Sequence, residues 1–172
     1  MVIWITGISG AGKTTVCQAV SALCKPQIPQ LVVIDGDIMR DVMGNDLSYR
    51  EKDRFIQITR IQKLAKALAE QDLVVLVGAL YARPDLLTWN RANLPGYFEV
   101  YISATLDLVR SRDPKGLYAK VDAGEISDVV GIDVPWHAPC EPDMLVDATC
   151  GEPADSVARK IASQVLGIEN MN

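Results

Sequence analysis

Histidine and closely spaced cysteines are scarce in this chain of 172 residues. The single histidine, His137, lies in a proline-flanked loop, and we assign it no catalytic role. The four cysteines, Cys17, Cys24, Cys140 and Cys150, show neither CxxC spacing nor a histidine-rich neighbourhood. This pattern argues against a metal-binding cysteine cluster and predicts buried free thiols in a reducing compartment.

The chain also lacks an excess of basic residues and a long apolar run. It has 17 Lys and Arg against 22 Asp and Glu, and this net charge of -5 argues against general nucleic-acid or membrane-surface binding. No apolar run reaches membrane-spanning length, and the strand-like VIWIT near the first residue leaves no room for a secretory leader. We therefore expect a cytoplasmic protein with no membrane and no nucleic-acid partner.

Short β-branched runs alternate with helix-like stretches along the sequence. Strands are predicted at residues 2–6, 31–34, 73–77, 97–102 and 144–146, and helices at 13–23, 51–71, 84–93, 105–112 and 153–166. Most of the strands are continuously apolar, which is typical of buried parallel strands. The alternation predicts an α/β fold of three layers with a mostly parallel sheet, and the chain length predicts that residues 1–172 form one domain.

Residues 113–142 form the least regular stretch and contain several glycines and prolines. A structureless loop of that length in a compact domain is usually functional, so this segment is predicted to be a flexible lid. At its start, RSRDPKGLYAK concentrates basic residues in an otherwise acidic chain. The expected lid residues are Arg110, Arg112, Asp113, Gly116 and Leu117, with Lys115 and Lys120 beside them.

The first predicted strand runs directly into GISGAGKTT, which satisfies the phosphate-loop pattern G-x-x-x-x-G-K-[ST]. In such a loop the backbone N–H groups and the start of the next helix bind phosphate oxygens, while the lysine contacts the terminal phosphates. The motif predicts a P-loop NTPase fold that binds a nucleoside triphosphate, with Thr14 offering its hydroxyl to Mg²⁺. The expected ATP-binding residues are Gly7, Ser9, Gly10, Ala11, Gly12, Lys13, Thr14 and Thr15.

Two carboxylates, Asp35 and Asp37, follow the second predicted strand in VVIDGDIMR. Because the carboxyl ends of parallel strands face the ligand crevice, both are expected beside the phosphates. There they can hold Mg²⁺ and accept a proton from an attacking hydroxyl. The alternative, which can coexist with these roles, is that Asp37 caps the next helix and Asp35 is a turn residue.

Taken together, GISGAGKTT, DGDIMR, DLSYREKDR, RDPKGLY, GEI and GID resemble the adenylyl-sulfate kinase family over nearly the whole chain. The family transfers the γ-phosphate of ATP to the ribose 3'-hydroxyl of adenylyl sulfate. The resemblance implies that Asp35 is the base, with Lys13 and Asp37 as the other catalytic residues and Thr14 and Asp37 as metal ligands. It also implies a homodimer, Mg²⁺ as cofactor, and a small-molecule nucleotide acceptor bound by Arg40, Tyr49, Arg54, Gln57, Lys115 and Lys120.

Three positions depart from the family pattern. Gln57 replaces an asparagine, Leu80 replaces a serine, and Val129 replaces one of two aromatic residues that hold the acceptor adenine. Since stacking of a base on a ring contributes about 1 to 3 kcal/mol, the missing ring predicts either weaker binding of adenylyl sulfate or another acceptor. Two alternatives therefore stay open: a kinase for another nucleotide, such as cytidine diphosphoramidate, and a non-catalytic nucleotide-binding regulator.

Overall fold

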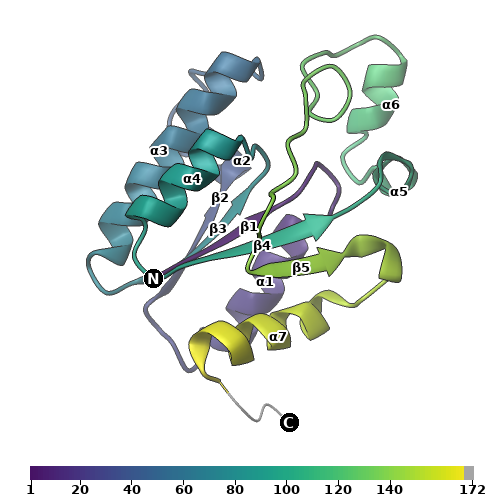
Figure 1. Ribbon diagram of the computed structural model, residues 1–172. Coiled ribbons are helices and arrows are strands. Elements are labelled where there is room, and N and C mark those ends of the chain that lie inside the picture. The colour runs from purple at the N-terminus through teal and green to yellow at the C-terminus, as the bar shows by residue number, and fades with distance from the viewer. Residues whose placement is uncertain (169–172) are drawn as a thin grey trace.

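A computed structural model describes residues 1–168 (Figure 1). Five strands form one sheet in the order β2-β3-β1-β4-β5, and every neighbouring pair is parallel. The strands are β1 (Val2–Thr6), β2 (Leu31–Asp35), β3 (Val74–Ala79), β4 (Tyr97–Ser103) and β5 (Met144–Asp147). The predicted fold is confirmed, and the central strand β1 is buried along its whole length, as its apolar sequence VIWIT requires.

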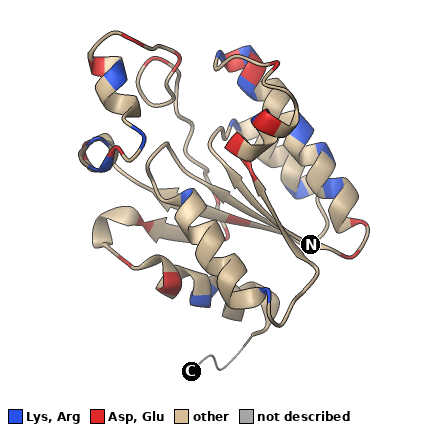
Figure 2. Ribbon diagram, turned by 180° about the vertical axis from the view of Figure 1, so that it is seen from behind, with Lys and Arg blue, Asp and Glu red and all other residues tan. Residues whose placement is uncertain are grey.

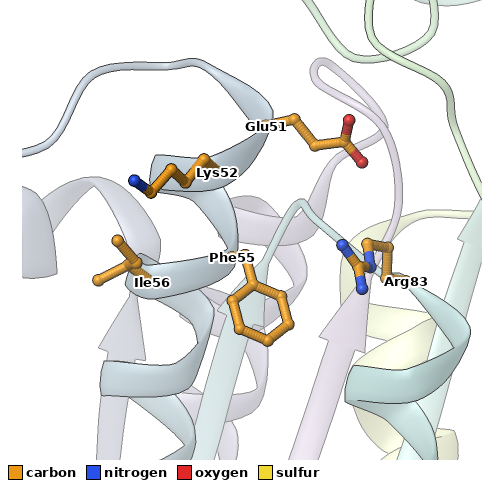
Figure 3. A pocket seen from close by; sticks show the side chains of 5 residues that line it. All are labelled: Glu51, Lys52, Phe55, Ile56 and Arg83. Atoms are coloured by element: carbon orange, nitrogen blue, oxygen red, sulfur yellow. The ribbon is translucent and has the colours of Figure 1, made fainter.

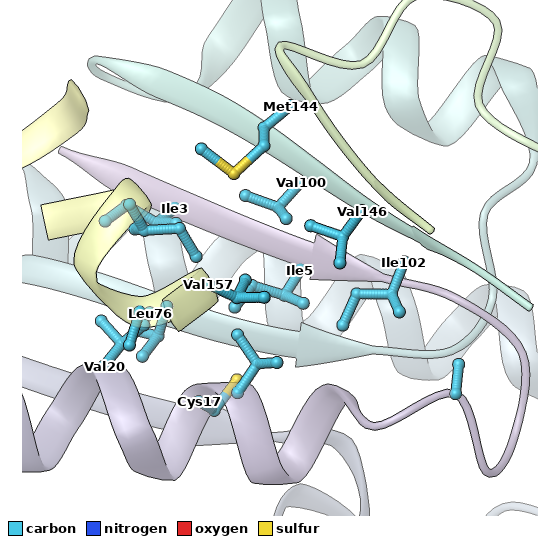
Figure 4. Close-up of a cluster of buried hydrophobic side chains, with 14 of the residues drawn as sticks. Ile3, Ile5, Cys17, Val20, Leu76, Val100, Ile102, Met144, Val146 and Val157 are labelled. Atoms are coloured by element: carbon cyan, nitrogen blue, oxygen red, sulfur yellow. The ribbon is translucent and has the colours of Figure 1, made fainter. Parts of the chain in front are cut away.

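Helices cover both faces of the sheet (Figure 1). On one face, α1 (Lys13–Cys24) packs against α7 (Ala154–Leu166), and their apolar residues meet alternate residues of the strands, such as Ile3 and Ile5 (Figure 4). On the other face, α3 (Glu51–Ala69) and α4 (Pro84–Asn93) bury Trp4 with their own apolar residues. Successive residues of a strand point to opposite faces, so one strand supplies both cores.

Two short helices are absent from the expected elements. The first, α2 (Gly36–Val42), follows β2 directly, and the second, α6 (Leu117–Asp122), lies inside the predicted lid after α5 (Leu106–Arg112). Neither is long enough to show a clear apolar period. A 3-10 turn, η1 (Ala148–Cys150), follows β5.

The segment 113–142 is therefore not structureless, while its role as a lid stays a prediction; we call it the lid below. Besides α6, the segment contains an isolated bridge between Val130 and Val134, and it buries Tyr118 and Val129 almost completely. These side chains join the hydrophobic cores on either face of the sheet. The apolar residues of the segment pack into these cores, which its glycines and prolines alone did not indicate.

The prediction of buried thiols holds for only half of the cysteines. Cys17 and Cys24 are buried in α1, whereas Cys140 and Cys150 are exposed in loops, and all four are free. Burial raises the pKa of the Cys17 thiol to about 12. Among residues 1–168, no helix is both long and apolar enough to cross a membrane.

A polar network lies at the start of β4, around the buried carboxylate of Glu99. The Tyr97 hydroxyl donates to Glu99 Oε2 at 2.7 Å, and Arg91 lies 3.7 Å from the same oxygen. The Glu99 backbone N–H donates to Asp143 Oδ2 at 2.7 Å, and Asp143 also accepts from Arg91. This network ties the end of the lid segment to the sheet, because Asp143 directly precedes β5.

Candidate active site

The phosphate loop connects β1 to α1, and its glycines are required by its shape. A Cβ on Gly7 would stand 2.6 Å from the Ile102 carbonyl oxygen, which leaves no room for a side chain. Gly12 caps α1 with a φ of 108°, a conformation that other residues rarely adopt. The loop therefore has the close turn that lets backbone N–H groups face a bound phosphate.

Lys13 lies folded against this loop. Its Nζ donates to the carbonyl oxygens of Gly7 and Ile8, each at 2.9 Å. Desolvation lowers the pKa of Lys13 to about 8, although the nearby carboxylates of Asp37 and Asp35 oppose this effect. The ammonium thus stays charged at neutral pH but titrates well below an ordinary lysine.

The Asp35 carboxylate joins the loop to the end of β2. Thr14 Oγ1 donates to Asp35 Oδ2 at 3.0 Å, and the Asp37 backbone N–H donates to Asp35 Oδ1 at 2.9 Å. The second bond makes Asp35 the N-cap of α2, so the alternative that Asp37 caps this helix is wrong. Asp35 takes that place because its backbone is still extended, as an N-cap residue requires, while Asp37 already lies in the first turn.

These oxygens suit a magnesium ion. The Thr14 hydroxyl and the Asp35 carboxylate are hydrogen-bonded partners, and Asp37 is close by in the next turn. No group of three or more His, Cys, Asp or Glu side chains with metal-site geometry occurs among residues 1–168. This sparse set of hard oxygen donors fits Mg²⁺, which is usually held by one or two protein oxygens together with water and substrate phosphates.

The lid reaches the same place through Lys115. Its ammonium donates to Asp37 Oδ2, and this bond raises the pKa of Lys115. Thr14 contacts Asp35 rather than Asp37, and the assignment of Thr14 and Asp37 as metal ligands stays a prediction. Carboxylates and cations of the site are therefore paired across segments that are distant in sequence.

The other expected lid residues brace the lid. Arg110 forms a salt bridge with Asp122 at 3.2 Å, and Arg112 Nη2 donates to the Ala148 carbonyl oxygen at 3.2 Å. Asp113 caps α6 by accepting from two of its backbone N–H groups, while Gly116 takes the left-handed conformation before that helix and Leu117 begins it. Lys120 is exposed on α6. Basic and acidic residues lie close together on this part of the molecule (Figure 2).

Two guanidinium groups meet at the ring of Tyr49. The Arg40 and Arg54 guanidinium carbons lie 4.4 Å and 5.4 Å from the ring centroid. Both arginines are almost fully buried, and within residues 1–168 neither forms a salt bridge with a carboxylate. Burial and the neighbouring charge of Arg40 lower the pKa of Arg54. Since buried charges are normally paired, this arrangement is typical of a site for an anion.

Two of the three departures from the family pattern, Gln57 and Val129, have different surroundings. Gln57 is buried, and its Nε2 has no hydrogen-bond partner among the described residues, as is also true of Arg54 Nε. Val129 is 4% exposed and belongs to the hydrophobic core together with Tyr118. Position 129 therefore offers no ring to a base that stacks on Tyr49.

An open pocket of about 500 Å³ lies beside the start of α3 (Figure 3). It is lined by Glu51, Lys52, Phe55, Ile56 and Arg83. The Arg83 guanidinium lies 5.0 Å from the Phe55 ring and forms hydrogen bonds with both carboxylate oxygens of Asp85. Its charge is already matched, so we do not include Arg83 among the anion-binding residues.

The family model for adenylylsulphate kinase matches residues 1–147. The chain belongs to this family. It is 35% identical over 164 residues to an adenylyl-sulfate kinase of Pseudomonas aeruginosa, covering 94% of this chain and 83% of that protein. It is also 33% identical over 165 residues to a cytidine diphosphoramidate kinase of Campylobacter jejuni, covering 94% and 96% of the two chains.

A solved structure of the Mycobacterium tuberculosis APS kinase CysC, in complex with AMPPNP and APS, has a similar fold. The TM-score is 0.86, with 32% identity over 97% of each chain. The chain matches two longer bifunctional relatives, of which it spans only 28% and 26% of the length. The family is one of phosphotransferases that act on an alcohol group, and this agrees with the phosphate loop and the Asp35 carboxylate.

Sequence reasoning left one residue of the site without a role. Tyr118 stands in the RDPKGLY segment, and its hydroxyl donates to the Ser9 carbonyl oxygen of the phosphate loop at 2.9 Å. The charges of this segment predict anion binding and give the tyrosine no role. A lone aromatic residue inside a basic, glycine-containing segment was the available signal.

Proposed function

We propose that this kinase transfers the γ-phosphate of ATP to the ribose 3'-hydroxyl of adenylyl sulfate, giving 3'-phosphoadenylyl sulfate. The observation that carries the proposal is the pair of buried guanidinium groups, Arg40 and Arg54, without carboxylate partners at the Tyr49 ring. The acceptor combines a flat base with an anionic phosphosulfate group, and a ring beside two guanidinium groups that donate only to backbone carbonyl oxygens among the described residues matches that combination. The P. aeruginosa relative and the M. tuberculosis structure support this choice.

The residues of this chain divide the reaction between them. The phosphate loop and Lys13 hold the triphosphate, and Asp35 accepts the proton of the attacking hydroxyl. Lys115 extends from the lid to Asp37, and its positive charge screens the transferred phosphoryl group. Thr14 and Asp37 would hold Mg²⁺, which would supply further neutralisation of phosphate charge.

The hydrogen bond between Thr14 and Asp35 favours this division of roles. It fixes the carboxylate next to the phosphate loop, while its N-cap bond from Asp37 fixes the orientation. Phosphoryl transfer between two bound nucleotides depends mainly on such positioning, because the protein forms no covalent bond to the phosphoryl group and must hold the two reactants in line.

The test is ADP release with Mg²⁺-ATP and adenylyl sulfate, compared with the Lys13→Met variant. Lys13→Met removes the charge while keeping an unbranched chain, so turnover is expected to fall to background. Equal ADP release by both proteins would assign the activity to a contaminant. No release from a wild-type protein that binds nucleotide would favour the regulator.

A second candidate is a kinase for cytidine diphosphoramidate. It is favoured by the C. jejuni relative and by the burial of Val129, which leaves Tyr49 as a one-sided stacking surface. The two candidates differ in the base, so kcat/KM for adenylyl sulfate and for cytidine diphosphoramidate decides between them. Higher kcat/KM for the cytidine substrate would replace the first candidate by the second.

The homodimer implied by the family resemblance also stays a proposal. Sedimentation of the full chain measures it directly: a mass of twice the monomer is expected, and a monomer at micromolar concentration would exclude it.

A further inference from the structure

Three successive carbonyl groups of the phosphate loop accept hydrogen bonds from side chains. Gly7 and Ile8 accept from Lys13, and Ser9 accepts from the hydroxyl of Tyr118. The Ser9 contact joins residues separated by 109 positions and reaches the loop from the lid. A carbonyl held on the outside of the loop leaves the backbone N–H groups free to face phosphate.

The tyrosine is held firmly on its own side. Tyr118 is 2% exposed and belongs to the hydrophobic core with Ile8 and Val109. Its backbone N–H donates to Asp113 Oδ1 at 3.2 Å, which anchors the start of α6. Since α6 begins directly after Lys115 and Gly116, the position of Tyr118 also fixes where the lid lysine stands.

The phosphate loop is packed on the same side. A Cβ on Gly10 would lie 3.2 Å from Val109 Cβ, so the loop apex contacts α5 closely. The contact from the Val109 side chain is apolar and does not orient a carbonyl group. The hydroxyl of Tyr118 supplies that orientation, because a hydrogen bond depends on direction as well as distance.

We propose that Tyr118 is a positioning residue that couples the lid to the phosphate loop, so that nucleotide affinity depends on a hydroxyl that does not touch the nucleotide. This inference rests on the proposed kinase function only in that ATP is the bound nucleotide, and it holds whether the acceptor is adenylyl sulfate or a cytidine nucleotide. Without the hydroxyl, the Ser9 carbonyl is free to turn inward, where it opposes phosphate. The lid helix also loses its directional link to the loop.

The test compares wild type with Tyr118→Phe, which keeps the ring and removes one hydroxyl. Binding of Mg²⁺ with a non-hydrolysable ATP analogue is measured by calorimetry, and the thermal midpoint is measured on the same samples. Tyr97→Phe is the matched control, because its hydroxyl is also hydrogen-bonded and partly buried but lies at the start of β4, away from the loop. Tyr118→Phe is expected to weaken nucleotide binding roughly 3- to 10-fold, and the control to leave it unchanged.

Amide hydrogen exchange is a second measurement, and it distinguishes coupling between the lid and the phosphate loop from a purely structural role of Tyr118 in the lid. In Tyr118→Phe, amides of residues 8–12 and of 117–122 are expected to exchange faster together, and bound nucleotide is expected to slow both. Unchanged nucleotide affinity with faster exchange in α6 alone would overturn the proposal, because the hydroxyl would then stabilise only the lid. A wild-type protein that binds nucleotide but does not phosphorylate adenylyl sulfate would refute the proposed function and leave this comparison valid.

Discussion

Replacement of Asp35 by asparagine separates its chemical role from its structural one. Asparagine is as good an N-cap as aspartate, so its side-chain oxygen keeps the bond from the Asp37 backbone N–H. Its amide nitrogen has no basicity and cannot take a proton from the acceptor hydroxyl. Asp35→Asn should therefore fold normally and bind nucleotide while losing turnover.

The size of the loss follows from the role. A positioned general base contributes about 10²- to 10⁴-fold, so kcat should fall by that factor. Asp35→Ala is the matched variant, since it also removes the cap of α2 and should cost about 1 kcal/mol of stability in addition. In a domain of this size such a loss lowers the thermal midpoint by about 2 to 4 °C.

The assay measures ADP release under saturating ATP and acceptor, together with calorimetric nucleotide binding and thermal melting. The expected pattern is low turnover in both variants, near-normal nucleotide affinity in Asp35→Asn, and a lowered melting temperature only in Asp35→Ala. Turnover of Asp35→Asn within a factor of ten of wild type would refute the assignment of Asp35 as the base.

Three further predictions concern charge. The pKa of Lys13 is about 8, and the lysine must be charged to bind phosphate, so nucleotide affinity should fall up to tenfold per pH unit above 8. Calorimetry should show proton uptake on binding in that range. Constant affinity from pH 7 to 9.5 would contradict this prediction. Lys115→Met removes the charge that screens the transferred group, so kcat should drop roughly 10²- to 10³-fold. Melting temperature should change little, because the ion pair with Asp37 is exposed, and a normal kcat would remove Lys115 from the reaction. Asp143→Ala leaves the Glu99 N–H without its acceptor and should cost about 1 to 3 kcal/mol by urea unfolding, with nucleotide affinity unchanged; unaltered stability would show that water replaces the carboxylate.

The part of the fold that could be predicted is the part with a long pattern. The apolar strand VIWIT, the phosphate loop behind it and the periodic helix α3 all lie where the sequence placed them, within a few residues. Helices α2 and α6 have seven and six residues, and such short segments show no period that distinguishes a helix from a loop. The lid appeared irregular because its glycines and prolines are visible in the sequence, while the burial of Tyr118 is not.

The candidate site shows the same division. Lys13, Thr14 and Asp35 could be placed together because the carboxyl ends of parallel strands share one edge of the sheet. The sequence could not show which carboxylate pairs with which cation, since the contact between Lys115 and Asp37 spans 78 positions and depends on how the lid folds. Nor could it show that Asp35, rather than Asp37, caps α2, because the choice rests on where β2 ends.

The most direct test of the proposed function is the mass of the product formed by the wild-type protein from Mg²⁺-ATP and adenylyl sulfate. The expected product is heavier than adenylyl sulfate by one phosphoryl group, carried on the ribose 3'-hydroxyl, and one ADP is formed for each product molecule. Unchanged adenylyl sulfate in a reaction where the same protein phosphorylates a cytidine nucleotide would contradict it.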